Sequence, residues 1–103
     1  MDYNLVITER AEYLLDNLVQ YLLFRLENEQ AAGHLLEKIG DIYKRIEENP
    51  YQFAECTDVY LKRKKYREAV VANMRYVVIF RVEGCMVYIL GVFHSLENYI
   101  SKL

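Results

Sequence analysis

The sequence predicts an α+β domain with the element order β-α-α-β-β-β, in which an antiparallel sheet is covered on one face by an N-terminal helical hairpin. Apolar residues recur at helical spacing up to about residue 49 and alternate at strand spacing after residue 66. Sequential strands joined by tight turns pair antiparallel, and the helices must bury their apolar stripes against the sheet. The 103 residues, of which 53% are hydrophobic, suffice for one core. We therefore expect residues 1–103 to form a single domain.

The N-terminal part is expected to contain a short strand and the first helix. Asp2–Ile7 alternates in the manner of a strand. Thr8 can then cap a helix that runs to about Asn28, with acidic residues in its first turn, where the helix dipole favours them. Tyr21, Leu23 and Phe24 widen the apolar surface beyond one stripe, which indicates that part of this surface contacts something other than the core. The stripe itself consists of Ala11, Leu14, Leu15, Leu18, Leu22 and Leu26.

A second helix follows within a few residues and completes the hairpin. It ends at Asn49, because Pro50 disfavours the α conformation in the residue before it. Gly33 and Gly40 each cost this helix about 1 kcal/mol relative to alanine, and close contact between the two helices would account for that cost. The apolar positions of the helix are Ala32, Leu35, Leu36, Ile39, Ile42, Tyr43 and Ile46.

Beyond the helices the sequence predicts a loop over Tyr51–Tyr60 and then three strands. Glu83-Gly84 is a two-residue hairpin signal, and Ala72–Met74 is a weaker turn. These turns separate the three β-rich runs Arg67–Ala72, Tyr76–Val82 and Cys85–Phe93.

Charge is divided unevenly along the chain. Residues 1–61 carry 5 Lys/Arg against 12 Asp/Glu, a net of −7, and residues 62–103 carry 8 against 3, a net of +5. Such an asymmetry concerns binding partners rather than fold. Much of the positive charge falls in one run, which is either a solvated linker or a surface for a polyanion or an acidic partner. This run contains Lys62, Arg63, Lys64, Lys65 and Arg67.

The middle strand of the C-terminal half alternates between two faces. Arg75 and Arg81, with Val77 and Ile79 between them, are expected on an open face of the sheet. Arg67, at the start of the neighbouring strand, can join them there. Guanidinium groups on such a face suit a phosphate backbone and an acidic peptide equally well. The residues expected to face the helices are Tyr76, Val78, Phe80 and Val82.

Few residues offer chemistry of their own. His94 follows the last strand directly and is either a structural residue or a general acid–base group, since an imidazole titrates near neutral pH. Tyr99 is interpreted first as a core aromatic, and otherwise as a stacking platform or an acid. Cys56 and Cys85 are expected to be small buried hydrophobic residues, because no Cys/His cluster accompanies them. His34 is expected to be exposed. We expect no metal site and no cofactor.

The chain is expected to remain in the cytoplasm without a membrane partner. No apolar run approaches the roughly 20 residues that a membrane span requires. The N-terminus has an acidic residue where a signal peptide has basic ones.

The order of motifs from residue 66 onward is the most specific feature of the sequence. A Tyr-Arg pair opens one strand, and the next strand begins with tyrosine and ends with an aromatic residue, an arginine and a valine. A third apolar strand then leads to a histidine and a last tyrosine. These positions are Tyr66-Arg67, Tyr76, Phe80-Arg81-Val82, Val87–Leu90, Val92, His94 and Tyr99. This order resembles that of the RelE/ParE superfamily of bacterial toxins, and the resemblance covers essentially the whole chain.

The resemblance implies the toxin of a type II toxin–antitoxin system, of the kind linked to growth inhibition and plasmid stabilisation. A cognate antitoxin would neutralise it by laying an extended or helical acidic segment across it. The expected assembly is either a toxin–antitoxin hetero-oligomer or a homodimer of the toxin. The candidate residues for binding the antitoxin or the target are Lys62, Arg63, Lys64, Lys65, Arg67, Arg75 and Arg81.

Two mechanisms divide the superfamily. RelE-like members cleave mRNA on the ribosome without a metal, and ParE-like members poison DNA gyrase. A cleaving site would have to use Arg67, Arg81, His94 and Tyr99. The chain departs from the nuclease pattern, because Val77 occupies a position that usually holds arginine, and Ala69 and Val71 occupy positions that usually hold charge. The sequence therefore favours a ParE-like toxin. The alternatives are a ribosome-dependent ribonuclease and a non-toxic relative that only binds an antitoxin, so enzymatic activity stays open.

Overall fold

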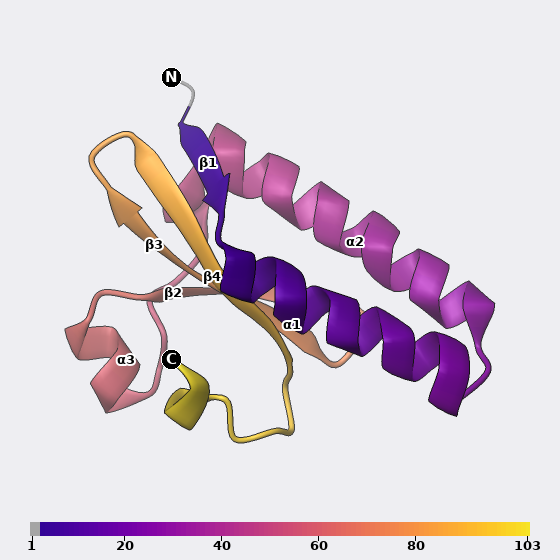
Figure 1. Cartoon of the computed structure of the whole chain (residues 1–103). Helices are drawn as coiled ribbons and strands as arrows, with labels where there is room; N and C mark the ends of the chain where they lie inside the picture. Colours follow the sequence, from indigo (N-terminus) through magenta and orange to yellow (C-terminus); the bar gives the residue numbers. More distant parts are fainter. Residues whose placement is uncertain (1–2) are drawn as a thin grey trace.

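The computed structural model describes residues 3–103, which form a four-stranded sheet in the order β1-β4-β3-β2 with helices packed against it (Figure 1). The strands are β1 (Asn4–Ile7), β2 (Arg67–Val71), β3 (Tyr76–Glu83) and β4 (Met86–His94). The helices are α1 (Glu9–Gln20), α2 (Glu29–Glu48) and α3 (Val59–Arg63). The predicted fold class is confirmed. The short helix α3 was not predicted, and it begins inside the segment that was expected to be a loop.

The first helix begins at the predicted cap. The Thr8 hydroxyl accepts a hydrogen bond from the Ala11 N–H at 3.1 Å and donates one to the Ile89 carbonyl at 2.7 Å. Thr8 therefore caps α1 and ties it to β4 at the same time. The α-helical geometry ends at Gln20, and a π-helical turn, Tyr21–Arg25, continues the helix close to its predicted end.

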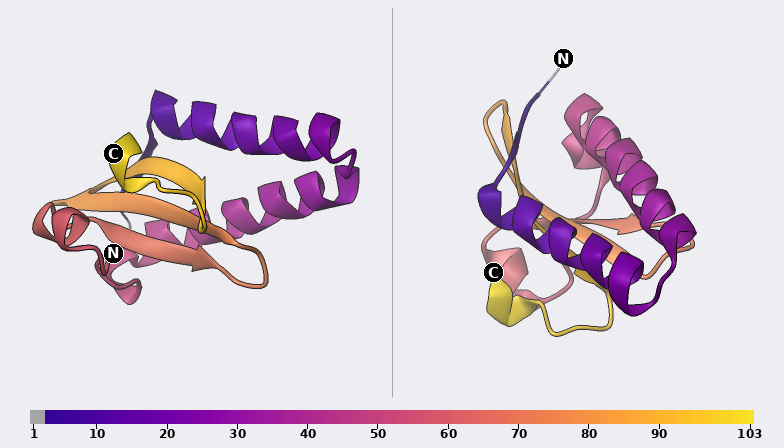
Figure 2. Two further views of the ribbon diagram at one scale, coloured as in Figure 1. Left: turned by 90° about the horizontal axis from the view of Figure 1, so that it is seen from below. Right: turned by 45° about the vertical axis from the view of Figure 1, so that its right-hand side comes forward.

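The second helix packs beside α1 and forms the predicted hairpin over one face of the sheet (Figure 2). Asn28 caps it by accepting a hydrogen bond from the Ala31 N–H at 3.0 Å, and it ends directly before the Asn49-Pro50 pair. A Cβ atom added at Gly33 or Gly40 would meet nothing within 4 Å. The expectation that these glycines serve close helix contact is wrong, because both lie on the exposed side of α2.

The sheet is antiparallel across the three C-terminal strands and parallel at one edge. β1 pairs with β4 in parallel, with Asn4 opposite Met86. Parallel strands require a long crossover connection. β1 and β4 can pair in parallel because all the elements from α1 to β3 lie between them in the sequence. The predicted first strand also included Asp2, which lies outside the described residues. The turn between β3 and β4 is Gly84-Cys85, one residue later than predicted, and Gly84 supplies the positive φ of +61°.

One core lies between the helical hairpin and the sheet. Val78 and Phe80 are fully buried there, with Tyr76 and Val82 packed at its margin. The predicted helix-facing side of β3 is therefore confirmed.

A second, smaller core covers the other face of β3. Val77 is 3% exposed and Ile79 is fully buried. Leu61 of α3 and residues near the C-terminus, including Tyr99, pack over them. The expectation of an open face is wrong, because α3 and the C-terminal segment, both too short to leave a periodic pattern, cover it. In Figure 1 these two segments lie next to each other.

The two cysteines differ in environment. Cys56 belongs to the second core and is buried, as expected, whereas Cys85 is exposed in the β3–β4 turn, which contradicts the prediction. Within residues 3–103, no helix is both long and apolar enough to cross a membrane.

Candidate functional site

The charged run after residue 61 belongs to a structured element rather than a linker. Asp58 caps α3 by accepting a hydrogen bond from the Leu61 N–H at 3.0 Å. The Leu61 side chain is buried against the sheet and holds α3 in place. The cations that follow Leu61 are all exposed. We call Lys62, Arg63, Lys64 and Lys65 the basic segment.

Two tyrosines flank the basic segment. Nζ of Lys64 lies 4.7 Å from the centre of the Tyr60 ring and 5.7 Å from the centre of the Tyr66 ring. A hydrogen bond with Tyr60 raises the pKa of Lys64 and so favours its charged form. Lys65 has a φ of +62°, a left-handed conformation that glycine and asparagine adopt most readily at the end of a helix.

Arg67 does not join the other arginines. It pairs with Phe80 in the β2–β3 ladder, so both side chains belong to the face that carries the helical hairpin. Nη1 of Arg67 donates to the Phe53 carbonyl at 2.6 Å, and the guanidinium lies 4.9 Å from the centre of the Tyr51 ring. The expectation that Arg67 lies beside Arg81 is wrong, because the register of β2 turns it to the opposite face.

Arg75 directly precedes β3, and Arg81 lies near the C-terminal end of that strand. Arg81 stacks on Tyr88, with Cζ 4.2 Å from the ring centre, and forms an ion pair with Glu83. Arg75 is exposed in the turn before β3. The length of strand between them spans roughly 20 Å, and its middle, at Ile79, is covered by the second core. The two arginines therefore do not form one continuous basic face.

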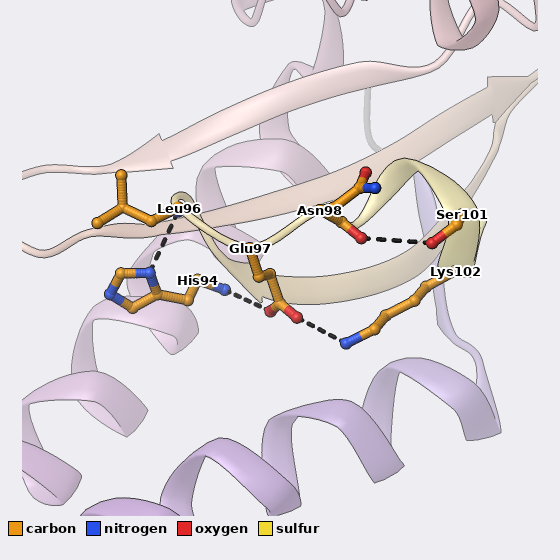
Figure 3. Close-up of polar contacts among 6 residues, drawn as sticks. All are labelled: His94, Leu96, Glu97, Asn98, Ser101 and Lys102. Atoms are coloured by element: carbon orange, nitrogen blue, oxygen red, sulfur yellow. Dashed lines mark hydrogen bonds and ion pairs between the residues drawn. The ribbon is translucent and has the colours of Figure 1, made fainter.

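His94 is held in a hydrogen-bonded turn at the end of β4 (Figure 3). The Nδ1 atom of the His94 ring accepts a hydrogen bond from the Leu96 N–H at 3.2 Å. The backbone N–H of His94 donates to the Glu97 carboxylate at 2.9 Å. Glu97 also pairs with Lys102 at 2.6 Å. Burial disfavours the Glu97 carboxylate, but the hydrogen bonds from Lys102 and the His94 N–H outweigh it and lower the pKa of Glu97. His94 thus fixes the start of the C-terminal segment.

The candidate catalytic residues do not converge. Tyr99 stacks on Phe93 in the second core, with ring centres 5.1 Å apart, and burial raises its pKa. The interpretation of Tyr99 as a core aromatic is confirmed. His94 and Arg67 pair with residues of the helical face, whereas Arg81 and Tyr99 belong to the other face. A base, an acid and phosphate-binding cations are therefore not gathered at one point. Within residues 3–103, no three His, Cys, Asp or Glu side chains are grouped to share a metal ion.

The helical hairpin carries exposed apolar surface, as its composition predicted. Phe24, in the π-helical turn, is 71% exposed, and Tyr21 beside it is half exposed. Leu26 and Leu36 are also exposed, although their spacing assigned them to buried stripes. The π-helical turn explains Leu26, because a π turn changes the phase of the helix. We call Tyr13, Tyr21, Phe24, Leu26 and Leu36 the apolar hairpin residues.

A groove of about 400 Å³ runs between α2 and β2. Charged residues of α2, among them Lys38, Arg45 and Glu48, form one wall, and Val70 and Val71 of the edge strand form the other. Sequence reasoning missed this groove, because only tertiary packing brings α2 beside β2.

The sheet, its helical hairpin and its exposed basic and apolar surfaces together define a small toxin domain of the RelE/ParE type. The family model described as ParE toxin of type II toxin-antitoxin system, parDE, matches residues 5–99. The chain belongs to this family and is the toxin component of such a system.

Solved structures support the same fold. Eight chains of solved structures match significantly. One is a chain of the chromosomal ParDE TA system from P. aeruginosa, with 20% sequence identity and a TM-score of 0.73, over 89% of this chain and 95% of that chain. A comparison with curated proteins gave no significant match.

Proposed function

We propose that this toxin arrests growth by inhibiting DNA gyrase in the bacterial cytoplasm, and that a cognate antitoxin neutralises it. We favour gyrase over the ribosome as the target because the candidate nuclease residues lie on both faces of the sheet. These residues are Arg67, Arg81, His94 and Tyr99. Cleavage of mRNA without a metal requires a base, an acid and phosphate-binding cations around one phosphate. Residues so dispersed suit a toxin that acts by binding its target.

The decisive experiment offers the purified toxin both targets. In one arm the toxin is incubated with gyrase, ATP and supercoiled plasmid, and trapped double-strand breaks are measured after protein denaturation. In the other arm it is incubated with translating ribosomes, and cleavage of the bound message is mapped by primer extension. We expect trapped gyrase–DNA breaks and an intact message. A cleaved message would identify a RelE-like ribonuclease, and inactivity in both arms would favour a relative that only binds an antitoxin.

We further propose that the antitoxin covers the apolar hairpin residues. These residues lie on both helices of the hairpin and at the π-helical turn, and several exposed apolar side chains in one region of a small protein are the usual mark of an interface. Large aromatic residues such as Phe24 and Tyr21 supply most of the binding energy where they are buried by a partner. Replacing Phe24 with serine is expected to weaken antitoxin binding by about 2 kcal/mol, or about 30-fold in Kd.

Isothermal titration with the antitoxin encoded beside the toxin gene measures this effect. His34→Ala serves as the matched control, because His34 is an exposed residue of the adjacent helix, outside the apolar set. Equal affinities for wild type, the Phe24 variant and the control would contradict the docking surface. They would leave the gyrase proposal untouched, because that proposal is tested without antitoxin.

A further inference from the structure

The basic segment displays its charge on a fixed scaffold. The buried side chain of Leu61 holds α3 against the second core. The Tyr66 N–H donates to the Leu61 carbonyl at 3.1 Å, so the turn after α3 is hydrogen-bonded to the helix. The Cys56 N–H donates to the Tyr66 carbonyl at 2.9 Å and ties this turn to the preceding segment. The cations are therefore held close together, and binding an anion would cost little ordering of the backbone.

This charge is not neutralised within the described part of the chain. The ion pairs there are Arg81 with Glu83 and Lys102 with Glu97, and neither includes a residue of the basic segment. Lys62 and Arg63 lie in the last turn of α3, and Lys64 and Lys65 follow in the turn that ends the helix. All four are exposed, so the end of α3 presents a compact positive surface.

The end of α3 requires a left-handed residue at position 65, because the Lys65 N–H donates to the Lys62 carbonyl at 2.9 Å and the Tyr66 N–H donates to the Leu61 carbonyl. The left-handed backbone of Lys65 disfavours any side chain with a Cβ, by roughly 1 kcal/mol relative to glycine. Glycine at this position would relieve the strain, whereas lysine adds a fourth consecutive positive charge. Lys65→Gly therefore removes one charge of the basic segment without removing the backbone conformation that ends α3.

The chemistry of the segment favours phosphate over carboxylate. Three of its four cations are lysines, which bind phosphate groups as point charges and require no fixed bidentate geometry. DNA presents a negative charge about every 1.7 Å along its axis, dense enough to engage several lysines at once. Tyr60, half exposed, lies within cation–π distance of Lys64 and so helps to hold that charge at the surface.

We propose that the basic segment binds the phosphodiester backbone of DNA, and that it contacts the DNA held by gyrase. This inference deepens the proposed function and rests on it for the identity of the DNA. The segment belongs to the face opposite the helical hairpin, so antitoxin on the apolar hairpin residues and DNA on α3 occupy separate surfaces.

The test is DNA binding by the toxin alone, without gyrase, measured by fluorescence anisotropy with a labelled duplex oligonucleotide at several salt concentrations. Four neutralised phosphates give a slope of log Kobs against log[salt] of about −3.6, or a loss of about 150-fold in affinity between 50 and 200 mM salt. Lys62→Gln and Lys65→Gly should each reduce the slope to about −2.7, or a loss of about 40-fold. Lys38→Gln on α2 is the matched control and should leave the slope unchanged.

Lys65→Gly separates binding from folding, because it should raise the midpoint of urea unfolding while it weakens DNA binding. Polyglutamate in place of DNA tests the acidic-protein alternative. Tighter binding to polyglutamate, a slope shallower than about −1, or equal losses from the Lys38 variant would overturn the inference. If the toxin binds DNA but traps no gyrase breaks, the proposed target fails and DNA binding stands. If it traps breaks without any DNA binding of its own, the DNA contact fails and the proposed target stands.

Discussion

Replacing Gly91 with alanine tests whether the second core is packed as tightly as its geometry indicates. A Cβ at residue 91 would lie 2.5 and 2.6 Å from two ring carbons of Phe93 and 3.1 Å from a methyl group of Leu14. Ordinary carbon–carbon contact begins near 3.5 Å, so the ring would have to move by about 1 Å. Phe93 is fully buried and stacks on Tyr99, which leaves the ring little room to move.

The expected magnitude follows from two opposing effects. Overpacking a well-filled core costs about 1–3 kcal/mol, and the lower entropy of the unfolded chain with alanine returns about 0.4–1 kcal/mol. We expect a net loss of about 1–2 kcal/mol in the free energy of unfolding. For a domain of this size the melting temperature then falls by about 5–15 °C.

Urea unfolding followed by far-UV circular dichroism measures the effect, with Gly33→Ala as the matched control. Because a Cβ at Gly33 meets nothing within 4 Å in the interior of α2, that variant should gain about 1 kcal/mol. A Phe93→Leu background provides the second check, since a smaller side chain removes the clash. A Gly91 variant as stable as wild type, or one whose cost is unchanged in the Phe93→Leu background, would refute this account.

Three further predictions concern Tyr43, Cys56 and Arg67. The Tyr43 hydroxyl is buried without a hydrogen-bond partner, so Tyr43→Phe should raise the free energy of unfolding by up to about 1 kcal/mol in urea titrations. Burial, with Glu12 nearby, raises the pKa of Tyr43 to about 12. The unfolded chain therefore loses this proton at a lower pH than the folded protein, so the free energy of unfolding should fall above about pH 10. This fall should be less steep in the phenylalanine variant, which lacks the titrating hydroxyl. Burial raises the pKa of the Cys56 thiol to about 12, so iodoacetamide should label Cys85 rapidly and Cys56 only after unfolding; equal rates would contradict the second core. Arg67→Ala should cost about 1–3 kcal/mol, because the Phe53 carbonyl loses a charged donor, and a change below 0.5 kcal/mol would show that water replaces it.

Features written in local sequence were predictable. Thr8 and Pro50 set the start of α1 and the end of α2, because capping and proline act within a turn or so of their own position. The helix-facing side of β3 followed from alternation alone. The β3–β4 turn was predicted to within one residue, because few residues besides glycine accept the positive φ it needs.

The face on which each arginine lies was not predictable in the same way. The side of Arg67 depends on the register of β2 against β3, which a shift of one residue would reverse. The cover over Ile79 comes from α3 and from residues at the far end of the chain, neither long enough for periodicity to reveal. The motif order places the candidate nuclease residues on neighbouring elements. In the structure they lie apart, on both faces of the sheet.

The parallel pairing of β1 with β4 has a consequence for how the toxin is made. Asn4 finds its partner only at Met86, and the Thr8 hydroxyl finds its acceptor only at Ile89. Since a ribosome adds roughly 5–20 residues per second, the N-terminal strand waits for seconds with no sheet to join. The sheet cannot be completed until β4 has been synthesised. A product that terminates before β4 should be an unfolded substrate for proteases, so a nonsense codon ahead of Met86 should inactivate the toxin as completely as one in α1.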